Sequence, residues 1–250
     1  MPAPDPKPRR AAAGAGYCGP MRTVILTGAG ISAESGVATF RDADGLWEGH
    51  DVTAVATPEG FAANPELVQR FYDERRRALG SVAPNAAHRA LAQLEAELGD
   101  DLLIVTQNVD DLHERAGATR VVHMHGELLN ALCSACDARH RWRDDLAPDP
   151  PCPACGAHAL RPDIVWFGEI PYHMEEIMRR LDECDLFASI GTSGEVYPAA
   201  GFVAHASAAG ARTVELNLDA SRGSSMFDEV RQGRATELVP RWVDEVIAGG

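Results

Sequence analysis

The stretch that decides the fold is RTVILTGAGISAESG, residues 22–36. Its first six residues form a β-branched apolar run that stops at Gly28-Ala29-Gly30, which is typical of a buried parallel strand followed by a tight turn. Glycines let a backbone approach a pyrophosphate, and the helix that follows offers free N–H groups. The pattern is G-x-G-x-x-A, with Ala33 where a third glycine is usual. By itself it leaves a plain strand-to-helix turn and a nucleotide site equally open.

Similar apolar runs recur along the chain, and helical patterns lie between several of them. The runs are DLLIVT (101–106), VVH (121–123), DLFASI (185–190) and RTVELN (212–217). The clearest helical patterns cover Pro65 to Leu79 and Asn85 to Leu98, the second with Asn85 as N-cap and Gly99 as its C-terminal stop. Strands that alternate with helices predict an α/β fold with a Rossmann-like, doubly wound parallel sheet.

Four of the six cysteines form two C-x-x-C pairs, Cys133 with Cys136 and Cys152 with Cys155, and 15 residues separate the pairs. Two such pairs can close a tetrahedral shell of thiolates, which suits Zn²⁺. Because four thiolates fill the shell, the predicted zinc ion is structural rather than catalytic. Two disulfides or an iron–sulfur cluster are the alternatives, and the absence of an export signal argues against disulfides.

The cysteine pairs lie in a segment, residues 126–161, that breaks the alternation of strands and helices. We expect it to be a small zinc-ribbon module inserted into a Rossmann-like domain made of residues 21–125 and 162–250. Residues 1–20 are rich in Pro, Ala and Gly, and we expect a disordered extension there. No apolar run approaches the roughly 20 residues that span a bilayer, so the expected location is cytoplasmic, without a membrane partner.

The charge balance limits the partners. There are 37 acidic and 23 basic residues, with a formal net charge of −14. Nucleic-acid binding needs clustered Lys and Arg, so no nucleic-acid partner is expected. Any anionic ligand must be held by local groups acting against the overall field.

The segment from Gly28 to Phe61 closely resembles the cofactor-binding segment of sirtuins, the NAD-dependent protein deacylases. Further motifs follow in the expected order: TQNVD (106–110), HMHGE (123–127), the cysteine pairs, VWFGE (165–169), GTSGEVYPAA (191–200) and NLD (217–219). The resemblance implies NAD as co-substrate, one structural zinc ion and acyl-lysine proteins or peptides as substrates. It implies acyl transfer from lysine to ADP-ribose, giving nicotinamide and O-acyl-ADP-ribose. We expect a monomer.

The resemblance also implies a set of NAD-binding residues. Phe40 and Arg41 would lie on the cofactor loop, and Asn217 with the backbone of Ala235 at the adenosine end. The full set is Gly28, Ala29, Gly30, Ala33, Glu34, Phe40, Arg41, Trp47, Gln107, Asn108, Asp110, Gly191, Thr192, Ser193, Asn217 and Ala235. Gln107 to Asp110 would hold the nicotinamide ribose and carboxamide, and Gly191 to Ser193 the phosphates or ribose.

Of the nine histidines, His123 and His125 follow a short apolar strand. The resemblance implies that His125, directly before Gly-Glu, is the general base that takes a proton from a ribose hydroxyl. A histidine suits this role because its ordinary pKa lies near neutral pH. Side chains alternate along a strand, so His123 would face the other way, and we expect no role for it.

The helix predicted over Pro65 to Leu79 carries an apolar stripe of Val68, Phe71, Tyr72 and Leu79, and Arg75 falls on it. The helical spacing predicts that Arg76 and Arg77 face solvent. Arg75 could lie along the surface or pair with a structural carboxylate. The motif F-Y-x-x-R resembles the sirtuin subgroup that removes succinyl, malonyl or glutaryl groups, in which the Tyr and Arg bind the distal carboxylate. Acetyl removal would coexist.

The acyl-lysine channel is implied by resemblance to be lined by Val165, Trp166, Phe167 and Gly168. Taken as residues alone, an apolar strand end with a large aromatic is more often core. A substrate peptide could add there as a short strand, with little sequence preference.

Three other functions remain open on the sequence. A Rossmann oxidoreductase would share the glycine turn and the zinc, but no acidic residue in strand context lies about 20 positions after the turn. A protein ADP-ribosyltransferase would use the same NAD chemistry with a different acceptor. A non-catalytic zinc-ribbon module would not bind NAD.

Overall fold

The structure is a computed structural model that describes residues 21–37, 46–47 and 49–249. The predicted extension 1–20 and two of the predicted NAD-binding residues, Phe40 and Arg41, lie outside the described residues. No helix in the described part of the chain is long and apolar enough to cross a membrane.

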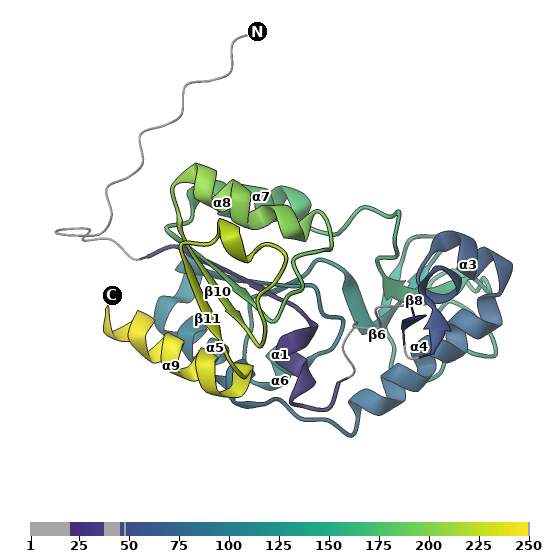
Figure 1. The fold of residues 1–250 in the computed structure, drawn as a ribbon. Coiled ribbons are helices and arrows are strands. Elements are labelled where there is room, and N and C mark those ends of the chain that lie inside the picture. The colour runs from purple at the N-terminus through teal and green to yellow at the C-terminus, as the bar shows by residue number, and fades with distance from the viewer. Residues whose placement is uncertain (1–20, 38–45, 48, 250) are drawn as a thin grey trace, which may run out of the picture.

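A six-stranded parallel sheet forms the larger part of the molecule (Figure 1). Its order is β11 (Glu229–Gln232), β10 (Arg212–Asn217), β9 (Leu186–Ile190), β1 (Thr23–Thr27), β4 (Leu102–Thr106) and β5 (Val121–His123). The chain moves outward from β1 in both directions, so the strand order reverses between β1 and β9. In such sheets the ligand site lies outside the carboxyl ends of the strands at this reversal.

The five strands predicted from apolar runs are confirmed to within one residue at each end. The sixth strand, β11, was not predicted, because its sequence EVRQ holds a single apolar residue and alternates between half-buried and exposed side chains. It pairs with β10 at the edge of the sheet, where one face contacts solvent.

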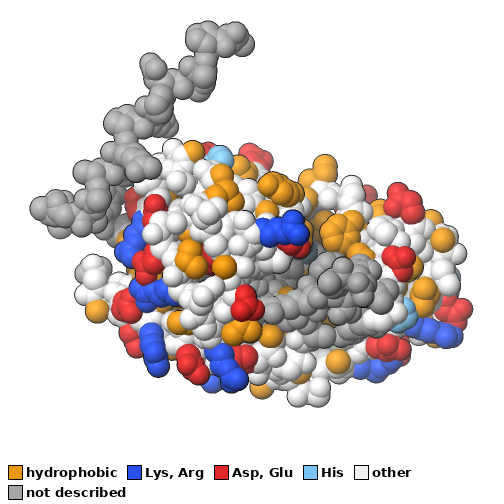
Figure 2. Space-filling view, in the orientation of Figure 1, with side chains coloured by type: hydrophobic (Ala, Val, Ile, Leu, Met, Phe, Trp, Pro, Cys, Tyr) orange, Lys and Arg blue, Asp and Glu red, His pale blue; other side chains and the backbone are white. Residues whose placement is uncertain are grey.

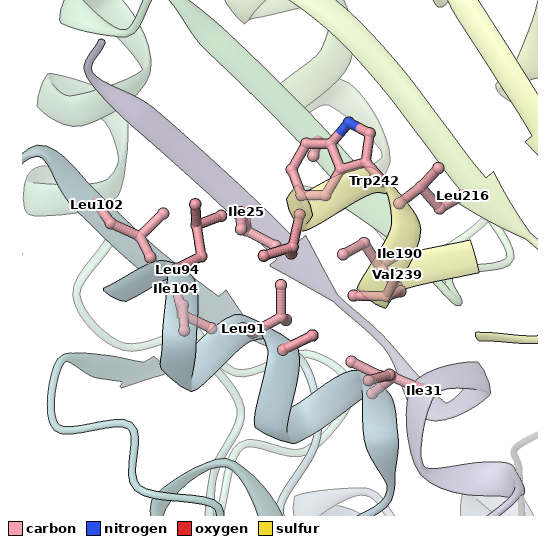
Figure 3. Close-up of a cluster of buried hydrophobic side chains, with 14 of the residues drawn as sticks. Ile25, Ile31, Leu91, Leu94, Leu102, Ile104, Ile190, Leu216, Val239 and Trp242 are labelled. Atoms are coloured by element: carbon pink, nitrogen blue, oxygen red, sulfur yellow. The ribbon is translucent and has the colours of Figure 1, made fainter. Parts of the chain in front are cut away.

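Helices cover both faces of the sheet. On one face lie α5 (Ala86–Leu98) and α9 (Ala235–Ala248), and on the other α7 (Met174–Glu183) and α8 (Phe202–Ala209). Because side chains alternate along β1, Ile25 packs with the α5 and α9 cluster (Figure 3), while Val24 and Leu26 pack beneath α7 and α8. A buried side chain of this size contributes roughly 1.5–3 kcal/mol, so the two-sided core accounts for much of the sheet's stability.

The predicted helix ends of α5 follow from two local signals. The Asn85 side chain accepts a hydrogen bond from the Ala87 backbone N–H at 2.9 Å, and Gly99 ends the helix with φ of +56°. Both residues were predicted for these positions, and both are confirmed.

A second, smaller sheet is antiparallel, in the order β7 (Arg139–Arg141), β6 (Gly126–Cys133), β8 (Leu160–Ile164). Three helices lie beside it, at the end of the molecule away from α9: α2 (Val52–Val55), α3 (Pro58–Ala63) and α4 (Pro65–Leu79). The remaining elements are α1 (Ala29–Ala33), the β2–β3 pair (Leu46–Trp47, His50–Asp51), α6 (Leu112–Arg115) and three short 3₁₀ turns, Gly99–Asp101, Ala199–Gly201 and Ser224–Met226. On the visible face, basic side chains are interspersed with acidic ones (Figure 2).

The predicted apolar stripe of α4 is buried, and it packs against Leu128, Ile164 and Trp166 of the smaller sheet region. The prediction that Arg76 faces solvent is wrong. Arg76 is only 3% exposed, and its guanidinium pairs with Asp73 and donates from Nε to the Leu128 carbonyl at 3.0 Å. Helical spacing misplaced it because a loop near residues 145–147 covers a second side of α4.

The Asp73 carboxylate joins α4 to that loop. Besides Arg76, it accepts hydrogen bonds from the backbone N–H groups of Leu146 at 2.9 Å and Ala147 at 3.0 Å. The loop lies between the two cysteine pairs in sequence. A buried ion pair therefore fixes α4 against the four-cysteine region, and Arg77, as predicted, remains exposed.

Replacing Arg76 by Met is expected to lower the free energy of unfolding by about 3–5 kcal/mol, since it leaves the buried Asp73 charge uncompensated. The measurement is urea unfolding followed by circular dichroism. Arg77→Met is the matched control: its partner Asp145 is exposed, with side-chain exposures of 56% and 44%, and such pairs contribute about 0–1 kcal/mol. Equal losses in the two variants would contradict the structural role of Arg76.

Candidate active site

A cavity of about 600 Å³ runs from the carboxyl ends of β1 and β9 to helix α4. It brings together most of the residues predicted from the sequence as site residues. Those that line it are Gly28, Ala29, Gly30, Tyr72, Arg75, Gln107, Asn108, Asp110, His125, Val165, Trp166, Phe167, Gly168, Gly191, Thr192, Ser193 and Asn217. The site therefore has one end at the glycine turns, one end at α4, and His125 in its lining.

At the first end, two turns pack directly on each other. The Gly30 backbone N–H donates to the Gly191 carbonyl at 2.9 Å. A Cβ on Gly30 would lie 2.7 Å from the Gly191 Cα, and one on Gly191 would lie 2.5 Å from the Ile31 nitrogen. Gly191 also has φ of +64°, in the left-handed region. Contact between the turns thus requires glycine here, in addition to the close ligand approach expected from the sequence.

Beside these turns, Asn108 and Asp110 are joined through Ser32. The Asn108 amide donates to the Gly28 carbonyl and to the Ser32 hydroxyl, each at 3.2 Å, and Ser32 donates to an Asp110 carboxylate oxygen at 3.0 Å. All three side chains are buried, and burial raises the pKa of the Asp110 carboxyl. The network holds the two predicted ribose- and amide-binding side chains in fixed orientations.

Ser32 was not predicted as a site residue. It lies in the quoted stretch ISAESG, but its role depends on contact with residues from another strand end. The only local signal for such a role was a small hydroxyl side chain close to the start of a helix.

His125 has a defined tautomer. Its Nδ1 lies 3.2 Å from the Gln107 carbonyl oxygen, and because a carbonyl only accepts, Nδ1 must carry the hydrogen. The lone pair is then on Nε2. Burial lowers the pKa of His125 from its ordinary value, so the ring is neutral at neutral pH and can accept a proton.

His123, for which no role was predicted, has a different environment. Its Nδ1 lies 3.1 Å from the Asn108 carbonyl oxygen, and its Nε2 lies 2.7 Å from a Glu114 carboxylate oxygen. Burial acts to lower the pKa of His123, but the hydrogen bond and charge of Glu114 act against it, and the net shift is upward. His123 therefore supports the backbone that carries Asn108.

Three predicted NAD-binding residues of the described chain, Ala33, Glu34 and Ala235, are not among the residues that line the cavity. Glu34 accepts hydrogen bonds from the backbone N–H of Thr236 at 3.0 Å and from its hydroxyl at 2.9 Å. This contact ties the end of α1 to the start of α9, where Ala235 is the first residue. Ala33 is the last residue of α1, and the Trp47 backbone pairs with His50 in the β2–β3 pair.

At the second end, Tyr72 and Arg75 line the cavity from α4. Tyr72 is fully buried, and its hydroxyl accepts a hydrogen bond from the Trp166 indole at 3.1 Å. Burial raises the pKa of the Tyr72 phenol, so it stays neutral. The half-buried Arg75 guanidinium lies over the Phe71 ring, 3.2 Å from its centre, and donates from Nη1 to the Phe71 carbonyl. Helix α4 thus contributes a cation and a hydroxyl-bearing side chain to the lining of the cavity.

The four cysteines meet away from the cavity. Their sulfur atoms all lie within 4.8 Å of one another, with Cys133 to Cys155 at 3.8 Å and Cys136 to Cys152 at 3.9 Å. A tetrahedron with zinc–sulfur bonds of about 2.3 Å has edges of about 3.8 Å. The thiol set and its spacing therefore fit a structural zinc ion.

Each cysteine pair is shaped by the same backbone turn. The residue after each second cysteine, Asp137 or Gly156, has positive φ and donates its N–H to the carbonyl of the first cysteine of the pair. In addition, His140 Nε2 lies 3.4 Å from the Cys152 sulfur. Backbone hydrogen bonds therefore contribute to the position of the thiols in addition to any metal ion.

Comparison with known proteins agrees with this geometry. Residues 28–198, more than half of the chain, match the model of the Sir2 family. The chain is 60% identical over 230 residues to an NAD-dependent protein deacylase of Pasteurella multocida (strain Pm70), covering 91% of this chain and 98% of that protein. It is 55% identical over 234 residues to an NAD-dependent protein deacylase of Caulobacter vibrioides (strain ATCC 19089 / CIP 103742 / CB 15), covering 92% and 98%.

Solved structures are similar over almost the same length. A Sir2 homolog–NAD complex has a TM-score of 0.83 at 38% identity, covering 91% of this chain and 90% of that chain. A Sir2 protein bound to acetylated peptide has a TM-score of 0.77 at 29% identity, covering 90% and 92%.

Metal analysis of the native protein is expected to give one zinc ion per chain. Removing it with a strong chelator, or replacing Cys136 by Ser, should lower the melting temperature, since metal binding adds to folding free energy. For a chain of this size, each kcal/mol lost shifts the melting temperature by about 2–4 °C. Native protein without zinc, or chelation without any loss of stability, would contradict the assignment.

Proposed function

The chain belongs to the Sir2 family and is an NAD-dependent protein deacylase, and we propose that it removes acidic acyl groups such as succinyl and malonyl from lysine as well as acetyl. The family, the Rossmann-like fold, NAD as co-substrate and deacylation were all predicted from the sequence and are confirmed. The proposed acyl preference is supported by one observation: Arg75 and Tyr72 of α4 both line the same cavity as His125 and the glycine turns.

Arg75 supplies the charge that an acidic acyl group needs. The chain has a formal net charge of −14, so a second carboxylate brought into the cavity requires a local cation. A guanidinium has five N–H donors in one plane and binds a carboxylate through two of them at once. Its contact with the Phe71 ring and carbonyl holds that plane in position.

Tyr72 adds a neutral donor. Its raised pKa keeps the phenol protonated, so no negative charge forms beside the incoming carboxylate. A hydrogen bond to a charged group contributes about 1.5–3 kcal/mol, which is enough to favour a carboxylate over a methyl group at this position.

We also propose that His125 is the general base. NAD, when bound, supplies the ribose that accepts the acyl group and the nicotinamide that leaves, and the expected product is O-acyl-ADP-ribose. His125 accepts the proton of a ribose hydroxyl at Nε2, because its Nδ1 hydrogen is directed at the Gln107 carbonyl. The lowered pKa keeps Nε2 unprotonated at neutral pH.

The NAD-binding roles of the remaining residues form part of the same proposal. Gly28 to Gly30 and Gly191 to Ser193 would hold the phosphates, Gln107 to Asp110 the nicotinamide half, and Asn217 the adenosine half. Their shared place in the cavity lining supports these roles. Phe40 and Arg41 belong to the proposal by resemblance, and so do Ala33, Glu34, Trp47 and the Ala235 backbone.

The division into a Rossmann-like domain of residues 21–125 and 162–250 and a zinc module of residues 126–161 is likewise proposed, together with a monomeric state, acylated proteins as substrates and a cytoplasmic location. The sulfur atoms of the four clustered cysteines are spaced for a metal ion rather than bonded as disulfides, which supports a reducing compartment.

His125→Ala is expected to fold and to bind NAD, and to lose turnover by about 10²–10⁴-fold, as removal of a general base does. Nicotinamide release from an acetyl-lysine peptide measures turnover, and calorimetric titration measures NAD binding. Mass spectrometry of wild-type products should show O-acyl-ADP-ribose; ADP-ribosylated protein in its place would favour the transferase alternative. Near-normal deacylation by the variant would remove His125 from the mechanism.

Arg75→Met is expected to lower the ratio of kcat/KM for succinyl-lysine over acetyl-lysine peptide by about 10–100-fold, through loss of a charge-assisted contact. The assay is a panel of acetyl, succinyl and malonyl peptides of one sequence, each with and without NAD. Arg77→Met, on the exposed side of α4, should leave the ratio unchanged. An equal loss on acetyl and succinyl peptides would show that Arg75 is structural.

A further inference from the structure

A hydrogen bond joins Trp166 to Tyr72 at the end of the cavity that α4 lines. The two residues are 94 positions apart, and the indole Nε1 lies 3.1 Å from the phenol oxygen. Both side chains are buried, with 2% and 0% exposure. The bond connects the segment after β8 to helix α4.

The direction of this hydrogen bond is fixed by chemistry. An indole N–H can only donate, so the Tyr72 oxygen must be the acceptor. The phenol has one hydrogen of its own, and that hydrogen is therefore directed away from Trp166. A carboxylate can only accept, so it requires a phenol that donates. The indole thus leaves Tyr72 as a donor, the form that suits an acidic acyl group.

The indole is itself held from several sides. The Arg161 guanidinium lies over its ring, 4.1 Å from the ring centre, and Arg161 pairs with Glu169 at 2.9 Å. Glu169 also accepts a hydrogen bond from the Trp166 backbone N–H at 2.8 Å. The centre of the Phe61 ring lies 5.1 Å from the centre of the Trp166 ring. A cation, a carboxylate and an aromatic ring together restrict rotation of the indole.

The backbone around Trp166 is fixed as well. Val165 N–H donates to the His125 carbonyl at 2.9 Å, and Phe167 N–H donates to the Ala56 carbonyl at 3.0 Å. The residues on either side of Trp166 are thus bonded to the base-carrying turn and to the end of α2. Neither the backbone nor the ring can move away from Tyr72 without breaking several contacts.

We propose that Trp166 is a positioning residue for acyl specificity: its indole N–H fixes Tyr72 as a hydrogen-bond donor to the distal carboxylate of an acidic acyl group. This inference rests on the proposed acyl preference. It assigns to Trp166 a role in acyl choice that acts through Tyr72, beyond lining the channel.

The test is a double-mutant cycle of Trp166→Phe and Tyr72→Phe, assayed on acetyl and succinyl peptides of one sequence. Trp166→Phe should lower the succinyl-to-acetyl ratio of kcat/KM by about 3–10-fold, and Tyr72→Phe by about 10-fold. The loss should lie in KM for the succinyl peptide, because carboxylate binding is equal in the ground and transition states. The double variant should show the ratio of Tyr72→Phe alone, since the indole then has no phenol to orient.

Benzothienylalanine at position 166, in which sulfur replaces the indole N–H, keeps the ring shape and serves as the second variant if Trp166→Phe is unstable. It should reproduce the drop in the ratio. A drop from Trp166→Phe that persists undiminished in the Tyr72→Phe background would overturn the inference. So would an equal loss on both peptides. If Tyr72→Phe leaves the ratio unchanged, the proposed role of Tyr72 in acyl preference is wrong. If Tyr72→Phe lowers the ratio but Trp166→Phe does not, only the positioning role of Trp166 is wrong.

Discussion

The contact between two glycine turns is the constraint on which the active site depends. The turn after β1 and the turn after β9 lie so close that a Cβ on Gly30 or Gly191 would sit within 3 Å of the opposite backbone. This contact lies beside the point where the strand order of the sheet reverses. It sets the distance between the two turns that carry the predicted phosphate-binding groups. The Asn108 amide donates to the Gly28 carbonyl, so the proposed nicotinamide half of the site contacts the same turn.

Helix α4 performs two tasks on neighbouring faces. One face buries Tyr72 and places Arg75 at the end of the cavity, while the next buries the Asp73–Arg76 pair against residues 146 and 147. The helix that carries Tyr72 and Arg75, the residues proposed to bind the acyl carboxylate, is therefore also held by contacts outside the cavity. A specificity pocket needs such support because a displacement of about 1 Å weakens charge-assisted contacts.

The sequence predicted most of the fold because strong signals were local. Apolar runs marked five strands, and Asn85 and Gly99 marked the ends of α5. The predictions failed where tertiary packing determines the structure. Strand β11 has no apolar run, and Arg76 is buried by a loop whose position cannot be derived from helical spacing. The site residues were predicted from several sequence motifs that occur in the order typical of one family, and many of these residues do line one cavity. Ser32 and His123 were missed because their importance lies in bonds to Asn108, a partner that no spacing rule reveals.

The central position of β1 has a consequence for how the protein is made. The start of β1 and the start of β9 are joined by the hydrogen bond from the Arg22 backbone N–H to Asp185 at 3.0 Å, across 163 residues. Strand β1 thus leaves the ribosome well before this neighbour, because 163 positions separate Arg22 from Asp185. Pairings between such distant segments slow folding, because a long loop must close before they form. The cofactor site needs the ends of both strands, so it cannot form before this long loop has closed.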